Sequence, residues 1–163
     1  MATGVIRETP NGYAAFMTAD RPMVTARAQL TCAGAADAVT AARWRHALRR
    51  WLQEVTEAPA NVRDDIVLGV NEALANCVEH AYRAQQAVGT MKLQASHDPG
   101  ARSISVCVSD RGSWRRPSSR TLSDPHASRG IMLMHTLADH CSISACPDGT
   151  TVCLDYTTRP HSS

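Results

Sequence analysis

The spacing of apolar residues changes near residue 90, and this change constrains the fold more than any other feature. Residues 35–55 and 62–83 place apolar side chains every three or four positions, which predicts two amphipathic helices. Other parts of the chain alternate apolar and polar side chains, the pattern of half-buried strands. Five segments show this alternation: 24–32, 90–97, 102–110, 140–145 and 150–156.

The order of these segments indicates the architecture. Turn sequences at 98–100 and 147–149 join the last four strands into two hairpins. A short helix over residues 130–139 is expected between the hairpins, whereas both long helices precede them. Antiparallel hairpins with helices grouped before them favour an α+β fold, a two-layer α/β sandwich. Its sheet is expected to be mixed but mostly antiparallel, with helices covering one face.

The length of 163 residues suits one domain and is too short for two well-cored domains. Residues 23–157 are expected to form this domain, with residues 1–22 as an N-terminal extension and residues 158–163 as a flexible tail. Tyr13 to Thr18 in the extension are compatible with an extra edge strand. The sequence has no run of ~20 apolar residues for a membrane span and no secretory signal. We therefore expect a cytoplasmic protein with no membrane contact.

Charge and cysteine content also limit the function. The formal net charge of +2 is too small to indicate nucleic-acid binding by itself. The arginines of residues 43–50, beside Trp44 and Trp51, are compatible with a nucleic-acid surface, but a solvated helix face with both tryptophans in the core is the favoured interpretation. The six cysteines form no C-x-x-C pair. Without a secretion signal we interpret them as small buried hydrophobic residues, not as disulfides or metal ligands.

Three polar residues on the second long helix are candidates for chemistry. Glu72, Asn76 and His80 recur at every fourth position, so their side chains project within an arc of about 80°. A glutamate can polarise a hydroxyl group or a water molecule, and an asparagine oxygen suits Mg²⁺. The same spacing is also compatible with a polar helix edge that carries three unrelated side chains.

Polar residues at the ends of later elements are further candidates. Asp110 ends a predicted strand two residues before Gly112; its carboxylate can accept a hydrogen bond from an exocyclic amine, although Asp-x-Gly is also a common turn. Arg129 and Gly130 are expected at the start of the short helix, where free backbone N–H groups can hold phosphate. Thr150 opens the last strand with a hydroxyl available to a ligand. The polar stretch 111–128 has the length typical of a lid.

In this order and spacing, the motifs of residues 24–156 resemble those of the GHKL ATPase/kinase superfamily, which has the Bergerat ATP-binding fold. The pattern Glu-x-x-x-Asn-x-x-x-His is similar to that of its bacterial anti-sigma factor serine/threonine kinases. The resemblance implies ATP and Mg²⁺ as cofactors, with Asn76 as the Mg²⁺ ligand and Glu72 as the catalytic base for an acceptor serine. His80 is grouped with the ATP-binding residues, without a role in proton transfer.

The resemblance also assigns the remaining candidates. Asp110 is similar to the aspartate that reads the adenine amino group, with Gly112 beside the ring and Thr150 assisting through its hydroxyl or a bound water. Arg129 and Gly130 match the segment near the β- and γ-phosphates, and Arg129 also suits contact with a protein partner.

The implied function is that of an ATP-dependent anti-sigma factor. Such a protein binds a sigma factor and phosphorylates a serine of a STAS-type anti-anti-sigma protein, so that partner switching regulates transcription. A homodimer is implied by the family alone, and no direct contact with nucleic acid is expected. The family's lid usually ends in Gly-x-Gly, but Ser128-Arg129-Gly130 keeps only the second glycine. The alternative is a nucleotide-gated module that binds the sigma or anti-anti-sigma protein with little or no kinase activity.

Overall fold

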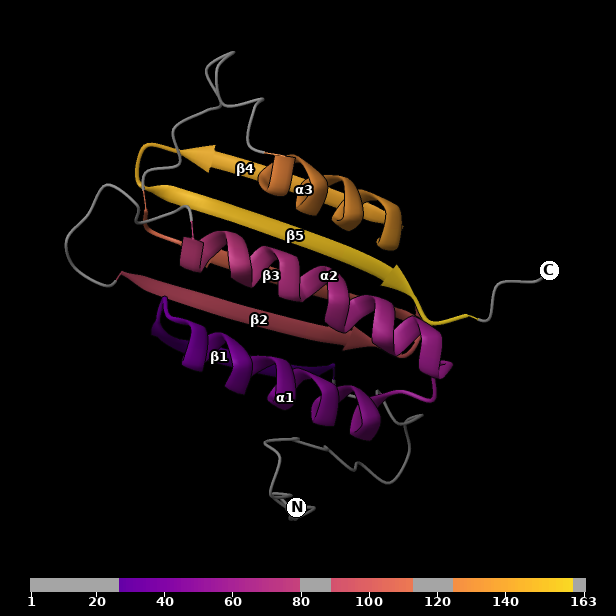
Figure 1. The fold of residues 1–163 in the computed structure, drawn as a ribbon. Coiled ribbons are helices and arrows are strands. Elements are labelled where there is room, and N and C mark those ends of the chain that lie inside the picture. The colour runs from indigo at the N-terminus through magenta and orange to yellow at the C-terminus, as the bar shows by residue number, and fades with distance from the viewer. Residues whose placement is uncertain (1–26, 80–88, 113–124, 160–163) are drawn as a thin grey trace, which may run out of the picture.

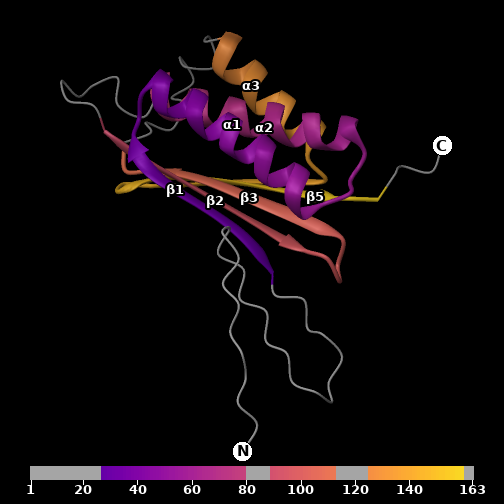
Figure 2. The ribbon, with the colours of Figure 1, turned by 90° about the horizontal axis from the view of Figure 1, so that it is seen from below.

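The computed structural model describes residues 27–79, 89–112 and 125–159, which form one sheet and three helices. In chain order the elements are β1 (Ala28–Ala35), α1 (Ala38–Val55), α2 (Ala60–Glu79), β2 (Thr90–Asp98), β3 (Ser103–Asp110), α3 (Pro125–Leu137), β4 (His140–Cys146) and β5 (Gly149–Thr157) (Figure 1). All three helices lie on the same face of the sheet (Figure 2). The predicted α+β fold, a two-layer sandwich with helices on one face, is confirmed.

The sheet has the strand order β1-β2-β3-β5-β4. Every neighbouring pair of described strands is antiparallel, whereas the sequence predicted a mixed, mostly antiparallel sheet. The two predicted hairpins, β2–β3 and β4–β5, join through the pairing of β3 with β5. This pairing places Asp110, the last residue of β3, opposite Thr150 near the start of β5. Two candidate site residues from different hairpins therefore meet at one end of the sheet.

Local signals explain where several elements begin. Helix α1 begins at Ala38, later than predicted, because Asp37 caps it and its Oδ1 accepts a 2.7 Å hydrogen bond from the Thr40 N–H. Strand β1 accordingly continues to Ala35, beyond the predicted end at residue 32. Helix α3 begins at Pro125, five residues before the predicted start. Proline suits the first helical position because its φ is preset and no N–H partner is needed there.

The hydrophobic core lies between the helices and the sheet. Helix α1 contributes large buried side chains: Trp44, Leu48, Trp51 and Leu52. Helix α2 and alternate residues of β2, β3 and β5 supply most of the rest, and each fully buried leucine or isoleucine contributes about 1.5–3 kcal/mol. Trp44 is 8% exposed and Trp51 is 6% exposed, so both tryptophans belong to the core as the favoured interpretation predicted.

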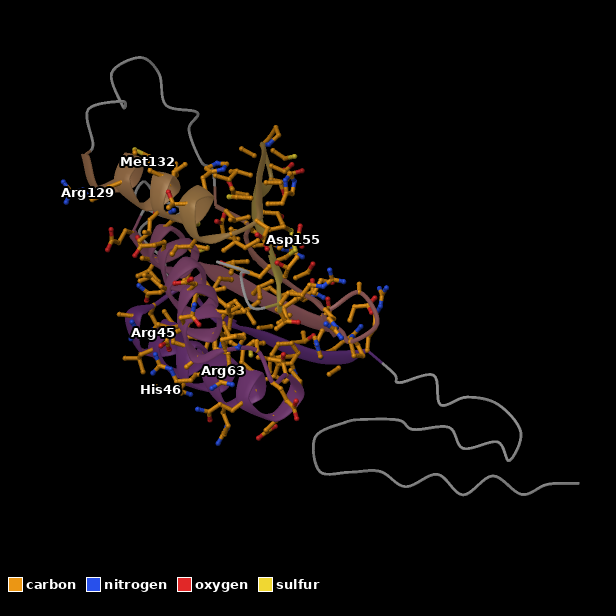
Figure 3. The ribbon with its side chains drawn as sticks, turned by 90° about the vertical axis from the view of Figure 1, so that its right-hand side faces the viewer. Arg45, His46, Arg63, Arg129, Met132 and Asp155 are labelled. Atoms are coloured by element: carbon orange, nitrogen blue, oxygen red, sulfur yellow. A yellow bond between two sulfur atoms is a disulfide. The ribbon has the colours of Figure 1, made fainter. Side chains whose placement is uncertain are left out.

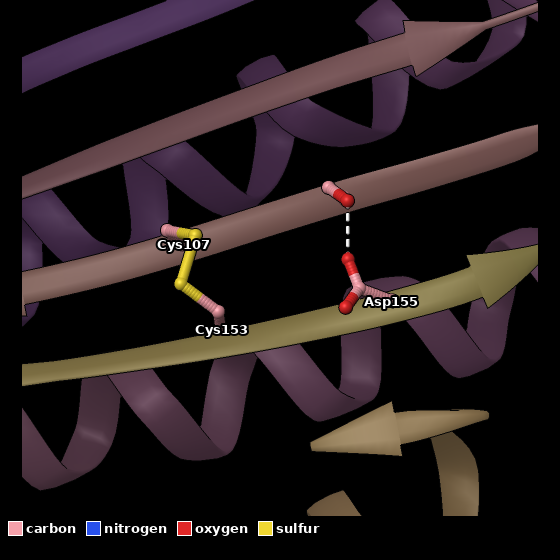
Figure 4. Close-up of a disulfide and its surroundings, with 4 residues drawn as sticks. Cys107, Cys153 and Asp155 are labelled. Atoms are coloured by element: carbon pink, nitrogen blue, oxygen red, sulfur yellow. Dashed lines mark hydrogen bonds between the residues drawn. A yellow bond between two sulfur atoms is a disulfide. The ribbon is translucent and has the colours of Figure 1, made fainter. Parts of the chain in front are cut away.

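A disulfide joins Cys107 of β3 to Cys153 of β5 (Figure 4). The two cysteines are opposite each other in the sheet, and their Cα atoms are 4.1 Å apart. On the next pair of the same face, the Ser105 hydroxyl donates to Asp155 (Figure 4). The interpretation of all six cysteines as unpaired small hydrophobic residues was therefore wrong for this pair. Alternation within each strand gives its buried face, but not which residue of another hairpin lies opposite.

The ends of the predicted domain lie partly outside the described residues. The proposed edge strand at 13–18 and most of the tail at 158–163 fall there, so the domain boundaries stay predictions. No helix of the described residues combines the length and apolarity needed to cross a bilayer.

Candidate functional site

Four of the predicted site residues surround one cavity between α2 and α3. Glu72 and Asn76 lie one turn apart on α2, and they line a cavity of about 300 Å³ together with Arg129 and Gly130 of α3. Asn76 is only 5% exposed, whereas Glu72 is half-buried. Arg129 is exposed and projects outward from α3 (Figure 3). The i, i+4 spacing read from the sequence thus places a carboxylate and an amide at the same cavity.

The backbone of Arg129 and Gly130 is not at a helix start. Because α3 begins at Pro125, both residues lie in its second turn. In that position the N–H groups donate to carbonyl groups four residues earlier and are not free. The expectation that these two N–H groups are available to bind phosphate was wrong. Arg129 is among the residues that line the cavity, although its side chain projects outward from α3 (Figure 3).

Gly130 allows α3 to approach Glu72 closely. A Cβ atom at position 130 would lie 2.9 Å from Oε2 of Glu72, which is closer than real Cβ contacts allow. The glycine is buried and helical, so its small size matters here and not a special backbone conformation. The Glu72 carboxylate is therefore held against the backbone of α3.

Asp110 forms the centre of a second group of residues at the end of the sheet. Its side chain is 7% exposed, and its Oδ1 accepts a 2.9 Å hydrogen bond from the Gly112 N–H. Its Oδ2 accepts from the thiol of Cys77 at 3.5 Å. Burial, and then the nearby charge of Asp110, raise the pKa of the Cys77 thiol far above its ordinary value. The thiol therefore keeps its proton and remains a donor.

Two predicted residues carry buried polar atoms without a hydrogen-bond partner among the described residues. They are Nδ2 of Asn76 and Oγ1 of Thr150, which is 2% exposed. Buried polar atoms are normally paired, so each such atom calls for a ligand, a water or another explanation. Trp51 Nε1 and Tyr156 Oη share this property in the core. Asn76 and Thr150, in contrast, both belong to the site that the sequence predicts.

The two groups adjoin each other but do not line the same cavity. Asp110 lines a separate hollow of about 340 Å³, with Met91 and Lys92 of β2 among its other lining residues. The family resemblance implies that one nucleotide touches both Asn76 and Asp110. Cys77 connects them, because it follows Asn76 in α2 and contacts Asp110. The described residues thus show two neighbouring groups, and one nucleotide bridging them stays a prediction.

Some predicted parts of the site lie outside the described residues. His80 does, and so does the central part of the predicted lid, residues 113–124. The described residues contain no group of three or more His, Cys, Asp or Glu side chains able to hold a metal. Mg²⁺ needs no such group, because it usually keeps several waters and binds one or two protein oxygens plus substrate phosphates. Oδ1 is the atom of Asn76 that could take that role, because the unpartnered Nδ2 is a hydrogen-bond donor.

The arginine-rich surface of α1 has its own hollow, whose lining includes Asn71, the residue before Glu72 in α2. A groove of about 630 Å³ between α1 and α2 is lined by Arg45, His46 and Arg49, with no predicted site residue among its lining. Figure 3 shows Arg45 and His46 close together on α1. Arg45 donates from Nη1 to Oδ1 of Asn71 at 2.8 Å and so ties the two helices together. Trp44 and Trp51 are in the core, so among the described residues neither tryptophan offers this surface a platform on which bases could stack.

Sequence reasoning missed the roles of Cys77 and Gly149. Cys77 was assigned to the core stripe of α2, although its position next to Asn76 was a signal that it lies near the site. Gly149 has φ +149°, and a Cβ atom there would clash with the backbone oxygen of Asp110. The sequence predicted a turn at Pro-Asp-Gly, but it did not predict how closely Gly149 approaches the backbone of Asp110.

Comparisons with known proteins identify the family and support the fold. Residues 34–156 match the family model described as the histidine kinase-like ATPase domain. The chain therefore belongs to this family, and the predicted relationship to the GHKL superfamily is confirmed. A search of curated proteins found no match.

Two solved structures are similar to the chain. The crystal structure of the RsbU and RsbW domains of Rv1364c from Mycobacterium tuberculosis has a TM-score of 0.63 and 26% identity, and the match covers 79% of this chain and 32% of that one. The histidine kinase domain of the blue-light activated histidine kinase EL346 from Erythrobacter litoralis has a TM-score of 0.52 and 19% identity, covering 74% and 60%. The second similarity supports the fold alone. The chain spans about a third of the Rv1364c structure.

Proposed function

We propose that this protein is an ATP-dependent anti-sigma factor that binds a sigma factor and phosphorylates a serine of a STAS-type anti-anti-sigma protein. Membership of the histidine kinase-like ATPase family supports the use of ATP. Similarity to a structure that contains an RsbW domain supports the partner-switching branch. The observation that carries the proposal is the pair of unpartnered buried atoms, Asn76 Nδ2 and Thr150 Oγ1, at the two ends of the predicted nucleotide site.

In this proposal the phosphate end of the nucleotide lies between α2 and α3. Mg²⁺ held by the Asn76 side chain would offset negative charge on the phosphates. Arg129 would add positive charge at the same cavity. Glu72 would orient the acceptor serine and accept its proton, while the serine oxygen bonds to the γ-phosphorus and ADP leaves with the bridging oxygen.

The base end of the nucleotide lies at the end of the sheet. The Asp110 carboxylate would accept a hydrogen bond from the adenine amino group, and Gly112 would leave room for the ring. The Thr150 hydroxyl, directly opposite Asp110, would bind the base or a bridging water. Release of the partner then follows from charge, because phosphorylation adds about −1.5 to −2 charges at the interface. A homodimer and a partner contact through Arg129 belong to the same proposal.

Titration calorimetry with ATP and Mg²⁺ tests the nucleotide site directly. We expect Mg²⁺-dependent binding that is strongly weakened by Asn76→Ala and unchanged by Asn61→Ala, an exposed asparagine in the first turn of the same helix. The absence of heat with any adenosine nucleotide, on folded protein, would overturn the proposal.

A second candidate function is a nucleotide-gated binding module with little or no kinase activity. It is favoured by Ser128, which stands where the family's lid usually has its first glycine. Incubation with ATP and the STAS-type proteins of the same genome separates the two functions. A mass increase of about 80 Da on one of these proteins indicates phosphotransfer, whereas ATP-dependent binding without this increase indicates the module.

A further inference from the structure

Two donors from different elements hold the carboxylate of Asp110. The Gly112 N–H donates to Oδ1 at 2.9 Å from the segment after β3, and the Cys77 thiol donates to Oδ2 at 3.5 Å from α2. Because these two donors bind different oxygens, they restrict the plane of the carboxylate as well as its position. Cys77 is 3% exposed, so water does not compete for this contact.

The physical chemistry of the pair supports a persistent hydrogen bond. A thiol is a weak donor to neutral acceptors, but an ionised acceptor in a low-dielectric environment strengthens the bond. The Sγ atom of the buried Cys77 lies 3.5 Å from Oδ2 of Asp110, within hydrogen-bond range for sulfur. The half-buried Cys32 of β1 has no such carboxylate contact among the described residues.

We infer that Cys77 is a positioning residue for nucleotide recognition: its thiol orients the Asp110 carboxylate toward the exocyclic amine of a purine. This inference rests on the proposed function, because it assigns base reading to Asp110. Cys77 directly follows Asn76, and successive residues of a helix point about 100° apart. One helix thus positions groups at both ends of the nucleotide: Asn76 at the phosphates and Cys77, through Asp110, at the base.

The test compares ATP with purine riboside triphosphate, which lacks the 6-amino group, in binding to the full chain. Cys77→Ala is expected to raise the Kd for ATP by about fivefold and the Kd for the analogue by less than about twofold. Cys77→Ser keeps a donor and is expected to restore the preference for ATP. Cys32→Ala is the matched control and is expected to change neither Kd.

If Cys77 has a purely structural role, Cys77→Ala weakens the binding of ATP and of the analogue equally, and that result overturns the inference. An unchanged preference of Cys77→Ala for ATP over the analogue overturns it too. If Cys77→Ala does not fold, Cys77→Val, which cannot donate, replaces it with the same expectation. Asp110→Asn is measured in parallel. If it abolishes the preference for ATP while Cys77→Ala keeps it, only this inference fails. If wild type shows no preference that depends on Asp110, base reading by Asp110 fails and the inference falls with it.

Discussion

Gly130 of α3 lies so close to Glu72 of α2 that a Cβ atom at position 130 would stand 2.9 Å from Oε2 of Glu72. The clashing atom is the far end of a flexible side chain, so the carboxylate can move aside at little cost in stability. Gly130→Ala also gains helix propensity, about 0.5–1 kcal/mol. We expect an unchanged or slightly raised free energy of unfolding and a phosphotransfer rate lowered by about tenfold. Urea unfolding and a labelled-ATP assay measure the two quantities.

Gly100→Ala is the control for this variant, because Gly100 lies in the β2–β3 turn and its nearest heavy atom is Asp98 Oδ1 at 3.4 Å. If Gly130→Ala and Gly100→Ala transfer phosphate equally fast, the contact of Gly130 with Glu72 has no role in the reaction.

Glu72 is expected to act on the acceptor hydroxyl and not on the nucleotide. Glu72→Gln keeps the size of the side chain but removes its ability to accept a proton. The phosphotransfer rate should fall by about 10²–10⁴-fold, while the Kd for ATP changes by less than about twofold. Glu57→Gln, an exposed carboxylate in the α1–α2 connection, serves as control. Undiminished labelling of the partner by Glu72→Gln removes Glu72 from the catalytic role.

Gly69 and Tyr156 form a tight contact between α2 and the sheet. A Cβ atom at position 69 would clash with Oη of Tyr156, whose side chain is only 3% exposed. The ring cannot move aside in the packed core, so Gly69→Ala should lower the free energy of unfolding by about 1–3 kcal/mol. Tyr156→Phe removes the clashing oxygen, which has no hydrogen-bond partner among the described residues.

The double variant Gly69→Ala/Tyr156→Phe should therefore recover most of the stability that Gly69→Ala loses. Tyr156→Phe alone should be neutral or slightly stabilising, because it removes an unpaired buried hydroxyl. Additive effects in this double-mutant cycle, measured by urea unfolding, would show that the two residues do not constrain each other.

The disulfide predicts both a thiol count and a stability difference. A chain purified without reductant should show four free thiols after denaturation, those of Cys32, Cys77, Cys141 and Cys146, and six after reduction. The bridge spans 46 residues, and its reduction should lower the free energy of unfolding by about 2–4 kcal/mol. Cys153→Ser should show the same loss, and dithiol reductant should have no further effect on it. Six free thiols in the unreduced chain would show that the bridge does not form in solution.

The buried His97 should make the free energy of unfolding fall in mild acid. Burial lowers the pKa of its imidazole, and the charge of neighbouring Asp98 offsets this only in part. The folded pKa lies below the unfolded one, so the unfolded chain binds the proton first as the pH falls. Stability is therefore full above about pH 6.5 and is lost as the pH falls through the folded pKa. The urea unfolding midpoint is measured at pH 7.5, 6.5 and 5.5. The midpoint of His97→Gln should decrease less with falling pH than that of wild type. His140→Gln, which alters an exposed histidine, is the control and should behave as wild type does.

The sequence predicted most of the fold because periodicity is a local property. The helix and strand patterns gave the order of the eight elements that the described residues form. The four-residue spacing placed Glu72 and Asn76 on one side of a helix, and in the structure both line the same cavity. The start of α3 was misplaced because the polar residues before 130 carry little periodicity, and the proline signal at Pro125 was taken as part of a loop.

Contacts between distant segments were harder to predict. The pairing of Cys107 with Cys153 depends on how β3 aligns with β5, which no local pattern specifies. For the same reason Cys77 was read as a core residue, since only the tertiary structure brings its thiol to Asp110. The shared cavity expected for Asn76 and Asp110 likewise depends on tertiary geometry, and the described residues place them on two neighbouring hollows.

The disulfide between β3 and β5 also affects the opposite face of these two strands, the face that the helices cover. A slip of one residue between two strands would turn every side chain of one of them to the opposite face. Asp110 and Thr150 lie three ladder positions from Cys107 and Cys153, so the bridge forbids such a slip where these two side chains must stay opposite each other. A bond on the helix-free surface thereby preserves the alignment of polar groups beneath the helices.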